Sequence, residues 1–351
     1  MVTPYERVSS DLRKKPHAWL ITGVAGFIGS NLLEALLRLN QKVVGLDNFV
    51  TGHAHNLEDV RASVGEAAWE RFDLIKGDVT NIEDCAAASF GIDYVLHQAA
   101  LGSVPRSIAD PIATTRANVD GFVNMLVAAK DSGVQRFVYA SSSAVYGDYP
   151  KLPKLEAQIG NPLSPYAVTK RANELYGEVF ARTYDVEVIG LRYFNVFGRR
   201  QDANGAYAAV IPRWFGHLLR GEVCLINGDG ETSRDFCYID NVVQANLLAA
   251  VVTVEGAINQ VYNIALGAKT TLNELYALIQ KSLLNASPDL SDLIDFAPVY
   301  GAPRPGDVRH SLADITKATR LLGYEPTRTV EQGISEALDW YITQLGRPNT
   351  K

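Results

Sequence analysis

The sequence has 351 residues, of which 47% are hydrophobic and 21% are charged, so it is long and apolar enough to build a large core. Its net charge of −6 offers no basic surface for nucleic acid and no polybasic segment for an anionic membrane. The three cysteines are widely spaced, the N-terminus is polar, and no apolar run reaches the roughly 18 residues of a membrane span. We expect a reduced, cytoplasmic protein that binds neither metal, nucleic acid nor membrane.

Apolar, strand-like runs alternate with helical patterns along the first half of the chain. The expected strands cover residues 19–22, 42–46, 74–75, 94–96, 136–139 and 188–191. An amphipathic helix is expected over residues 30–39. Such alternation predicts an α/β fold with a doubly wound, parallel Rossmann-type sheet that helices cover on both faces.

A glycine-rich loop follows the first expected strand and opens the first helix. Gly23, Gly26 and Gly29, with Phe27 and Ile28 before the last of them, have the spacing of a dinucleotide-binding turn in the context that such a turn requires. The glycines permit a tight turn and close approach of backbone to a pyrophosphate, whose charge the helix N-terminus favours. We therefore expect a dinucleotide cofactor here.

Residues at the ends of the following strands extend this cofactor site. Asp47 would accept hydrogen bonds from the adenosine ribose and repel a 2′-phosphate, so NAD is preferred to NADP. Asp78 either meets the adenine amine or caps its strand, and His97 is expected to be a packed strand-end residue. The remaining cofactor contacts are expected to come from Asn48, Val79, Gln98, Ala99, Ala100 and Tyr193.

Tyr166 and Lys170, one helical turn apart, and Ser142 upstream form the candidate catalytic set, and the first two also contact the cofactor. A phenol titrates near ~10, but a neighbouring ammonium and the positive ring of an oxidised nicotinamide favour the phenolate. This arrangement suits removal of a hydroxyl proton while hydride leaves the same carbon. A Tyr-x-x-x-Lys pair alone occurs by chance on surface helices, whereas its combination with the glycine loop and Ser142 indicates redox chemistry.

Two domains are expected. Residues 1–190 would form the NAD-binding domain, to which residues 236–264 return. Residues 191–351, with loops rich in Gly, Pro and Asp, would mainly form a smaller α/β domain for the substrate. Ligands of doubly wound sheets bind beyond the carboxyl ends of the strands, which is where the candidate residues fall.

These motifs resemble those of the extended short-chain dehydrogenase/reductases, and within them the nucleotide-sugar 4-epimerases of the UDP-N-acetylglucosamine type from bacterial polysaccharide and O-antigen pathways. The similar segments are 22–29, 97–100, 141–147, 164–170, 192–198, 233–236 and 304–307. The resemblance implies that Tyr166 takes the 4″-hydroxyl proton, that Lys170 holds the nicotinamide ribose and lowers the pKa of the tyrosine, and that Ser142 hydrogen-bonds the same oxygen. A 4-keto sugar would then turn over and receive the hydride on its other face.

The resemblance also implies contacts to a UDP-sugar. Arg234 and Arg304 would bind the diphosphate, with a domain-bridging ion pair as the alternative for each, and Asp307 would contact the uridine ribose. Arg199 and Arg200 are interpreted as either a solvated turn or a ligand contact. Further substrate contacts are expected from Ser103, Ser142, Ser143, Asn195, Ala209, Val210, Asn227 and Ser311.

Substrate choice depends on the wall of the sugar pocket. A serine at position 311, where relatives carry a bulky or a smaller residue, leaves space for a 2-acetamido group. This favours UDP-GlcNAc and UDP-GalNAc, with their uronic acids as further substrates and UDP-glucose/UDP-galactose or UDP-glucuronate as the alternative. A 4,6-dehydratase or a UDP-glucuronate decarboxylase would carry acidic residues where this chain has Ser143 and Ala144.

A non-catalytic NAD-binding scaffold would not need Ser142, Tyr166 and Lys170 together. The resemblance further implies a homodimer formed through the helix that bears Tyr166. Leu175 and Val179 would supply part of this contact, or would instead face the chain's own core.

Overall fold

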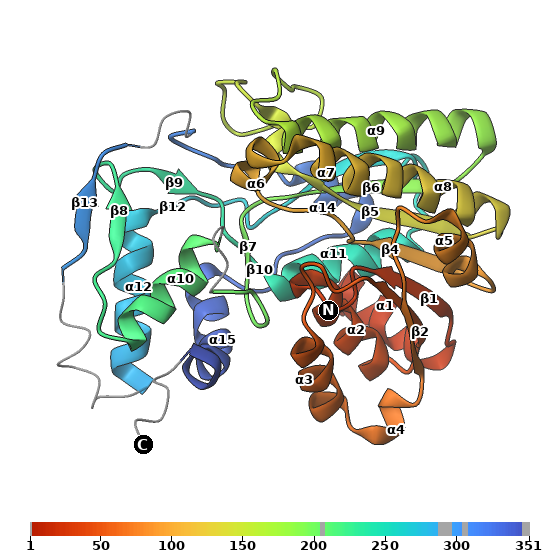
Figure 1. Ribbon diagram of the computed structural model, residues 1–351, viewed down its shortest axis with the longest axis horizontal. Coiled ribbons are helices and arrows are strands. Elements are labelled where there is room, and N and C mark those ends of the chain that lie inside the picture. The colour runs from red at the N-terminus through yellow and green to blue at the C-terminus, as the bar shows by residue number, and fades with distance from the viewer. Residues whose placement is uncertain (1, 204–207, 287–296, 304–307, 346–351) are drawn as a thin grey trace.

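The computed structural model describes residues 2–203, 208–286, 297–303 and 308–345, and a sheet of seven parallel strands lies at its centre (Figure 1). The spatial order of the strands is β11-β6-β5-β4-β1-β2-β3. They are β1 (Ala18–Thr22), β2 (Lys42–Asp47), β3 (Phe72–Lys76), β4 (Tyr94–His97), β5 (Arg136–Ser142), β6 (Val188–Tyr193) and β11 (Gln260–Ile264). The six strands expected from the sequence are all present, so the expected fold class is confirmed. The seventh strand lies within residues 236–264, while the division into two domains stays a prediction.

Helices cover both faces of this sheet (Figure 1). Successive strand residues point to opposite faces, so Trp19 and Ile21 join one apolar cluster whereas Leu20 joins the other. The first face carries α1 (Pro4–Lys14), α2 (Phe27–Arg38), α3 (Ala54–Val64) and α11 (Ile239–Val251). The second face carries α5 (Ile82–Ser89), α8 (Gly121–Asp131) and α9 (Pro165–Tyr184).

Shorter helices connect these layers. They are α4 (Glu66–Trp69), α6 (Val104–Ala109), α7 (Pro111–Thr115), a π-helical turn over Arg116–Asp120 and a 3₁₀ turn over Ser143–Tyr146. Because all strands of the sheet are parallel, their carboxyl ends meet at one edge. The loops from these ends into α2, α6 and the 3₁₀ turn therefore converge there.

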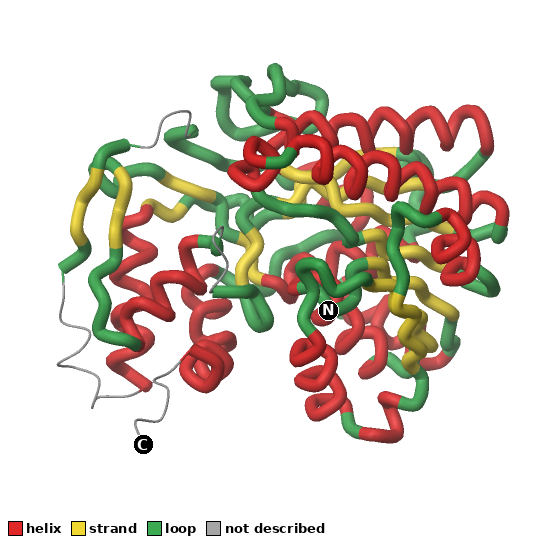
Figure 2. Tube along the Cα trace, in the orientation of Figure 1, coloured by secondary structure: helices red, strands yellow, loops and turns green. Residues whose placement is uncertain are grey.

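A second group of elements lies beside this edge, at the left of Figure 2. Its helices α10 (Val210–Leu219), α12 (Leu272–Ala286) and α15 (Val330–Leu345) pack on one another, while α14 (Thr316–Leu322) packs on β11. Among the described residues, three two-stranded sheets accompany these helices. These pair β7 (Val196–Phe197) with β10 (Cys237–Tyr238), β9 (Ser233–Arg234) with β12 (Thr270–Thr271), and β8 (Leu225–Asn227) with β13 (Val299–Gly301).

The start of α9 shows how local sequence fixes the position of the catalytic candidates. Ser164 is the N-cap, and its hydroxyl accepts a hydrogen bond from the backbone N–H of Ala167 at 3.2 Å. Pro165 occupies the first helical position, where its missing N–H costs nothing. Tyr166 and Lys170 consequently lie in the first two turns, beside the end of β5.

Neither a membrane span nor a metal cluster occurs in the part of the chain that the structure describes. No described helix is both long and apolar enough to cross a membrane. No group of three or more His, Cys, Asp or Glu side chains among the described residues is arranged to hold a metal ion.

Candidate cofactor and active site

The glycine loop adopts a conformation that only glycine permits. Gly23 has φ +70°, and its N–H donates to the carbonyl of Leu46 at 2.8 Å. A Cβ on Gly29 would lie 2.1 Å from the carbonyl oxygen of Gly23. Gly26, the N-cap of α2, has no side chain that would occupy the first amides of the helix, so these remain available to an anion.

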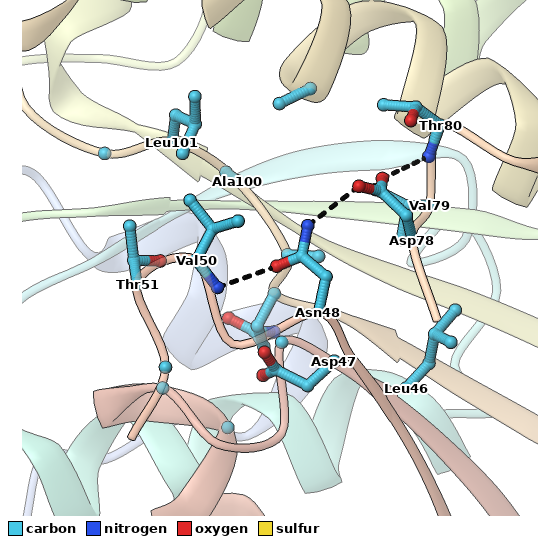
Figure 3. A pocket seen from close by; sticks show the side chains of 18 of the residues that line it. Leu46, Asp47, Asn48, Val50, Thr51, Asp78, Val79, Thr80, Ala100 and Leu101 are labelled. Carbon is cyan, nitrogen blue, oxygen red and sulfur yellow. Dashed lines mark hydrogen bonds between the residues drawn. The ribbon is translucent and has the colours of Figure 1, made fainter. Parts of the chain in front are cut away.

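A cavity of about 600 Å³ opens over this loop (Figure 3). It lies beyond the carboxyl ends of β1 to β4, the place where a doubly wound sheet binds its ligand. The expected cofactor residues that line it are Gly23, Gly26, Phe27, Ile28, Gly29, Asp47, Asn48, Asp78, Val79, Gln98, Ala99 and Ala100. Lining residues that were not anticipated include Val50, Thr51, Gly77, Thr80, Leu101 and Arg116.

Polar contacts organise the adenosine end of the cavity. The buried Asp47 carboxylate accepts the N–H of Ala25 and the N–H of Phe49, each at 2.8 Å, and it retains lone pairs for ribose hydroxyls. The amide of Asn48 donates to Asp78 at 2.8 Å (Figure 3). Burial opposes ionisation of Asp78, but hydrogen bonds from Thr80 and Asn48 outweigh it and lower the pKa. The carboxylate of Asp47 would repel a 2′-phosphate, while the guanidinium of Arg116 lies near Asp78 in the same cavity.

Two expected cofactor residues, Gln98 and Tyr193, belong to one hydrogen-bonded group with Asn246. The Tyr193 hydroxyl lies 3.2 Å from Oε1 of Gln98, and Nδ2 of Asn246 donates to this hydroxyl at 2.9 Å. Gln98 lines the cavity, whereas Tyr193 does not and supports it from behind. Asn246 was not anticipated, because it is one of several polar residues of α11 and nothing in the local sequence distinguishes it.

The three catalytic candidates lie together. Ser142 ends β5, and its hydroxyl forms a hydrogen bond with Tyr166. The ammonium of Lys170 donates to the carbonyl of Ala140 at 2.8 Å and lies 5.9 Å from the centre of the Tyr166 ring. Their arrangement is the one that the sequence led us to expect, although the chemical role of each stays a prediction.

Desolvation is the largest influence on the pKa values of Tyr166 and Lys170. Burial raises the pKa of Tyr166, and the hydrogen bond from Ser142 offsets only part of that rise. Burial also lowers the pKa of Lys170 to about 8. Desolvation therefore keeps the pKa of the tyrosine above its ordinary value in this structure, and the lowering effect that the resemblance assigns to Lys170 stays a prediction.

His97 is a packed residue, as expected. Its Nδ1 lies 2.9 Å from the Thr22 hydroxyl, and its ring contacts the rings of Phe122 and Phe137. Burial lowers the pKa of His97 to about 3, so the imidazole is neutral. The Thr22 hydroxyl also accepts the N–H of Ala99 at 3.2 Å, which fixes the cavity wall.

Three of the expected substrate residues gather around β9. Arg234 is on this strand, and its guanidinium donates to the carbonyl of Ser233 at 3.0 Å. The N–H of Ser311 donates to the same carbonyl at 3.0 Å. Asn195 follows β6, and its amide donates to the carbonyl of Asp235 at 3.3 Å. Residues from three distant parts of the sequence therefore meet here.

The other expected substrate residues that the structure describes lie at the ends of helices and strands. Ser103 caps α6 with an unusual φ of +92°, and Ser143 opens the 3₁₀ turn. Ala209 and Val210 begin α10, and Asn227 ends β8. Arg304 and Asp307 lie outside the described residues.

Arg199 and Arg200 do not form a solvated turn. The side chain of Arg200 is also not placed to contact a ligand. Arg200 is buried and binds Glu34 of α2 and Asp59 of α3, with its Nε 2.6 Å from the Asp59 carboxylate. Arg199 lies 3.7 Å from Glu34. The sequence did not reveal this cluster because its acidic partners lie more than a hundred positions upstream.

Asn118 is a further polar residue that was not anticipated. It lies in the π-helical turn, a local irregularity that is common at functional sites. Its side chain accepts the N–H of Leu101 at 2.7 Å and donates to the carbonyl of Leu101 at 3.2 Å. It also donates to the Thr169 hydroxyl of α9 at 3.1 Å, so it ties the cavity wall to the catalytic helix.

Known proteins resemble this chain over nearly its whole length. The model of the NAD-dependent epimerase/dehydratase family matches residues 19–265. A UDP-glucose 4-epimerase from Mycolicibacterium smegmatis is 35% identical, over 92% of this chain and 97% of the relative. The structure of a UDP-N-acetylglucosamine 4-epimerase from Methanobrevibacter ruminantium, in complex with UDP-N-acetylmuramic acid, has a TM-score of 0.84 and 37% identity, and covers 94% of this chain and 99% of that one.

A UDP-glucuronic acid 4-epimerase from Bacillus cereus, solved with UDP-glucuronic acid and NAD, has a TM-score of 0.80 and 29% identity. It covers 93% of this chain, which itself spans 99% of that structure. The expectation that the cofactor is NAD is thereby confirmed. With a family match over residues 19–265 and relatives above 30% identity, the chain belongs to the NAD-dependent epimerase/dehydratase family.

Proposed function

We propose that this chain, a UDP-sugar 4-epimerase that uses NAD, interconverts UDP-N-acetylglucosamine and UDP-N-acetylgalactosamine through a 4-keto intermediate. The observation that carries this proposal is the group of Ser142, Tyr166 and Lys170 at the carboxyl end of β5, the edge of the sheet at which the cofactor cavity opens. A protein that only binds the cofactor has no use for a hydrogen-bonded phenol and hydroxyl at this place.

The cavity fits NAD. Gly23 and Gly29 leave the turn open for a pyrophosphate, and Asp47 faces the cavity where the adenosine ribose would lie. When bound, NAD accepts a hydride from the sugar and later returns it. Lys170 is expected to hold the nicotinamide ribose, and Gln98 with Ala99 would line the nicotinamide side.

The protein's own groups move the proton. Tyr166 would receive the proton of the 4″-hydroxyl, and Ser142, already hydrogen-bonded to the phenol, would hold the same sugar oxygen. Because both half-reactions occur on one bound intermediate, positioning supplies much of the acceleration. No acidic side chain stands at positions 143 and 144, where elimination of water would need one.

The preference for N-acetylated sugars rests on small side chains. Ser103, Ser143 and Ser311 would leave space for a 2-acetamido group, whereas a bulky residue at position 311 would fill it. The relatives carry the names of UDP-glucose, UDP-N-acetylglucosamine and UDP-glucuronate epimerases, so the two other sugars are the alternatives to test.

The proposal is tested by NMR of the purified protein with UDP-GlcNAc and without added NAD. We expect UDP-GalNAc to form, and to form faster than UDP-galactose forms from UDP-glucose in a parallel sample. Faster conversion of UDP-glucose or UDP-glucuronate would overturn the substrate assignment. A 4-keto-6-deoxy product, or no change in any of the three sugars, would overturn epimerisation itself.

A homodimer formed through α9 belongs to the same proposal. Leu175 and Val179 do not face the chain's own core, since 47% and 44% of their surfaces are exposed. Val168 and Tyr176 are exposed on the same helix. A second copy of the chain would cover this apolar surface.

A further inference from the structure

Asp235 is a fully buried acidic residue that the proposed chemistry does not use, with 0% of its surface exposed. Its carboxylate accepts three backbone N–H groups, from Leu266 at 2.9 Å, Gly267 at 3.2 Å and Ala313 at 3.1 Å. Burying a carboxylate is costly unless such donors replace its water. The carboxylate of Asp235 lies between three segments of the fold, and these segments indicate its role.

The first segment carries the candidate diphosphate ligand. Asp235 directly follows β9, so its backbone is continuous with Arg234. Its own carbonyl accepts the amide of Asn195, the expected sugar or diphosphate contact. The main chain of Asp235 therefore fixes the positions of both Arg234 and Asn195.

The second segment is the loop that leaves the central sheet. Leu266 and Gly267 lie between β11 and β12, and β12 pairs with β9 through Thr270 and Arg234. The carboxylate therefore fixes this loop just before it turns back to pair with the strand of Arg234. The position of the arginine is thereby tied to the sheet that carries the cofactor cavity.

The third segment carries the expected wall of the sugar pocket. Ala313 lies two residues after Ser311, whose N–H is bound by the carbonyl of Ser233. One side chain thus joins β9, the end of the sheet and the segment of Ser311.

We infer that Asp235 is a positioning residue that assembles the UDP-binding side of the active site without touching the substrate. This inference rests on the proposed function. The cofactor cavity is lined by other residues, so loss of the Asp235 carboxylate is expected to weaken binding of UDP and to leave binding of NAD unchanged.

The test is Asp235→Asn, which keeps the size of the side chain but replaces one acceptor oxygen by an NH₂ group facing backbone donors. Calorimetry with UDP on the NAD-loaded protein is expected to give a dissociation constant at least about tenfold higher than that of the wild type, equivalent to about 1.4 kcal/mol. The NAD content after purification should not change. Asp339→Asn, the same substitution at an exposed site on α15, serves as the matched control and should bind UDP as the wild type does.

Equal UDP affinity in wild type and Asp235→Asn would overturn the inference. Failure of the wild type itself to bind UDP would overturn the proposed function instead. Loss of NAD from a folded asparagine variant would also overturn the inference. If the asparagine variant does not fold, amide exchange of the wild type provides a second measurement. UDP is expected to slow exchange at Leu266, Gly267 and Ala313; unchanged exchange at all three would also overturn the inference.

Discussion

Lys170 is buried and Tyr166 is half-buried at the start of α9, and desolvation favours the neutral form of each. The pKa of the tyrosine is raised, while the pKa of the lysine falls to about 8. A phenolate in this place needs positive charge close by, and the ring of oxidised NAD is the charge that the cofactor cavity would bring. Proton removal by Tyr166 is consequently expected only when the cofactor is bound in its oxidised form.

The substitution Tyr166→Phe is expected to lower turnover about 10²–10⁴-fold, the usual contribution of a general base. Its NAD content should match that of the wild type, because the substitution removes one hydroxyl and leaves the glycine loop and Asp47 of the cofactor cavity unchanged. Turnover is measured by NMR, and bound NAD is measured after denaturing the protein. Tyr184→Phe, at the exposed end of the same helix, is the control and should retain activity. Comparable turnover in both variants would exclude Tyr166 as the base.

Local sequence patterns predicted those site residues that lie at strand ends or whose partners are close in sequence. Tyr166 and Lys170 were found from their spacing on one helix, and Ser142 from its place after a strand. Asp235 and Asn246 were not found, because their hydrogen-bond partners are brought together only by the tertiary fold. In the local sequence, an amide or carboxylate that is buried and positions other residues looks the same as one on the surface.

At the scale of elements, a buried ion cluster joins α2, α3 and the segment after β7. Burial alone would raise the pKa of Glu34, but the charges of Arg200 and Arg199 outweigh it and lower the pKa to about 2. The carboxylate is therefore more easily ionised in the folded protein than in the unfolded chain. Asp59 lies on α3, the helix that follows the loop carrying Val50 and Thr51 of the cavity wall, so the cluster ties this helix to α2.

The Glu34 ion pairs predict how stability depends on pH. Because the folded pKa of about 2 lies below the ordinary value of 4.5, the stabilisation is fully present above pH 4.5 and is lost as the pH falls towards 2. A tenfold change in an ionisation constant corresponds to about 1.4 kcal/mol, so Glu34→Gln should lower the free energy of unfolding by about 3 kcal/mol at pH 7 and by progressively less in acid. Urea unfolding at several pH values measures this.

The exposed pair of Arg61 and Glu66 offers a control for the Glu34 variant. Glu66→Gln should change the unfolding free energy little, since exposed ion pairs contribute little. A loss in Glu34→Gln that stays constant between pH 7 and pH 3 would contradict the electrostatic explanation and would indicate a packing effect.

The long elements followed from the sequence, whereas the short ones did not. The strands of the central sheet are apolar runs between helical patterns, and β1 to β6 lie at the expected positions. The pairs β7–β10 and β9–β12 consist of two-residue strands, too short for any periodicity to reveal. They pair through backbone contacts between segments that are distant in sequence, so the substrate side of the fold could be placed only from the structure.

At the scale of the whole molecule, α9 has two faces with different tasks. Its inner face packs on β5 and β6 and holds Tyr166 and Lys170, while its outer face exposes Leu175, Tyr176 and Val179. Contiguous apolar surface of this kind marks an interaction site. Covering it by the same helix of a second copy would bury the patch through a two-fold contact. The dimer would then restrain the helix on which the catalytic residues lie.

The double substitution Leu175→Glu with Val179→Glu is expected to convert the dimer into a monomer, because it places charges in an apolar contact that cannot pair them. Analytical ultracentrifugation measures the mass. The control is Phe90→Glu, which introduces the same charge at a site 86% exposed, at the end of α5. If the α9 variant stays dimeric and the control becomes monomeric, the interface lies elsewhere. If the wild type is itself a monomer, the proposed dimer is excluded. If the contact does restrain α9, the monomeric variant should also turn over UDP-sugar more slowly while retaining NAD.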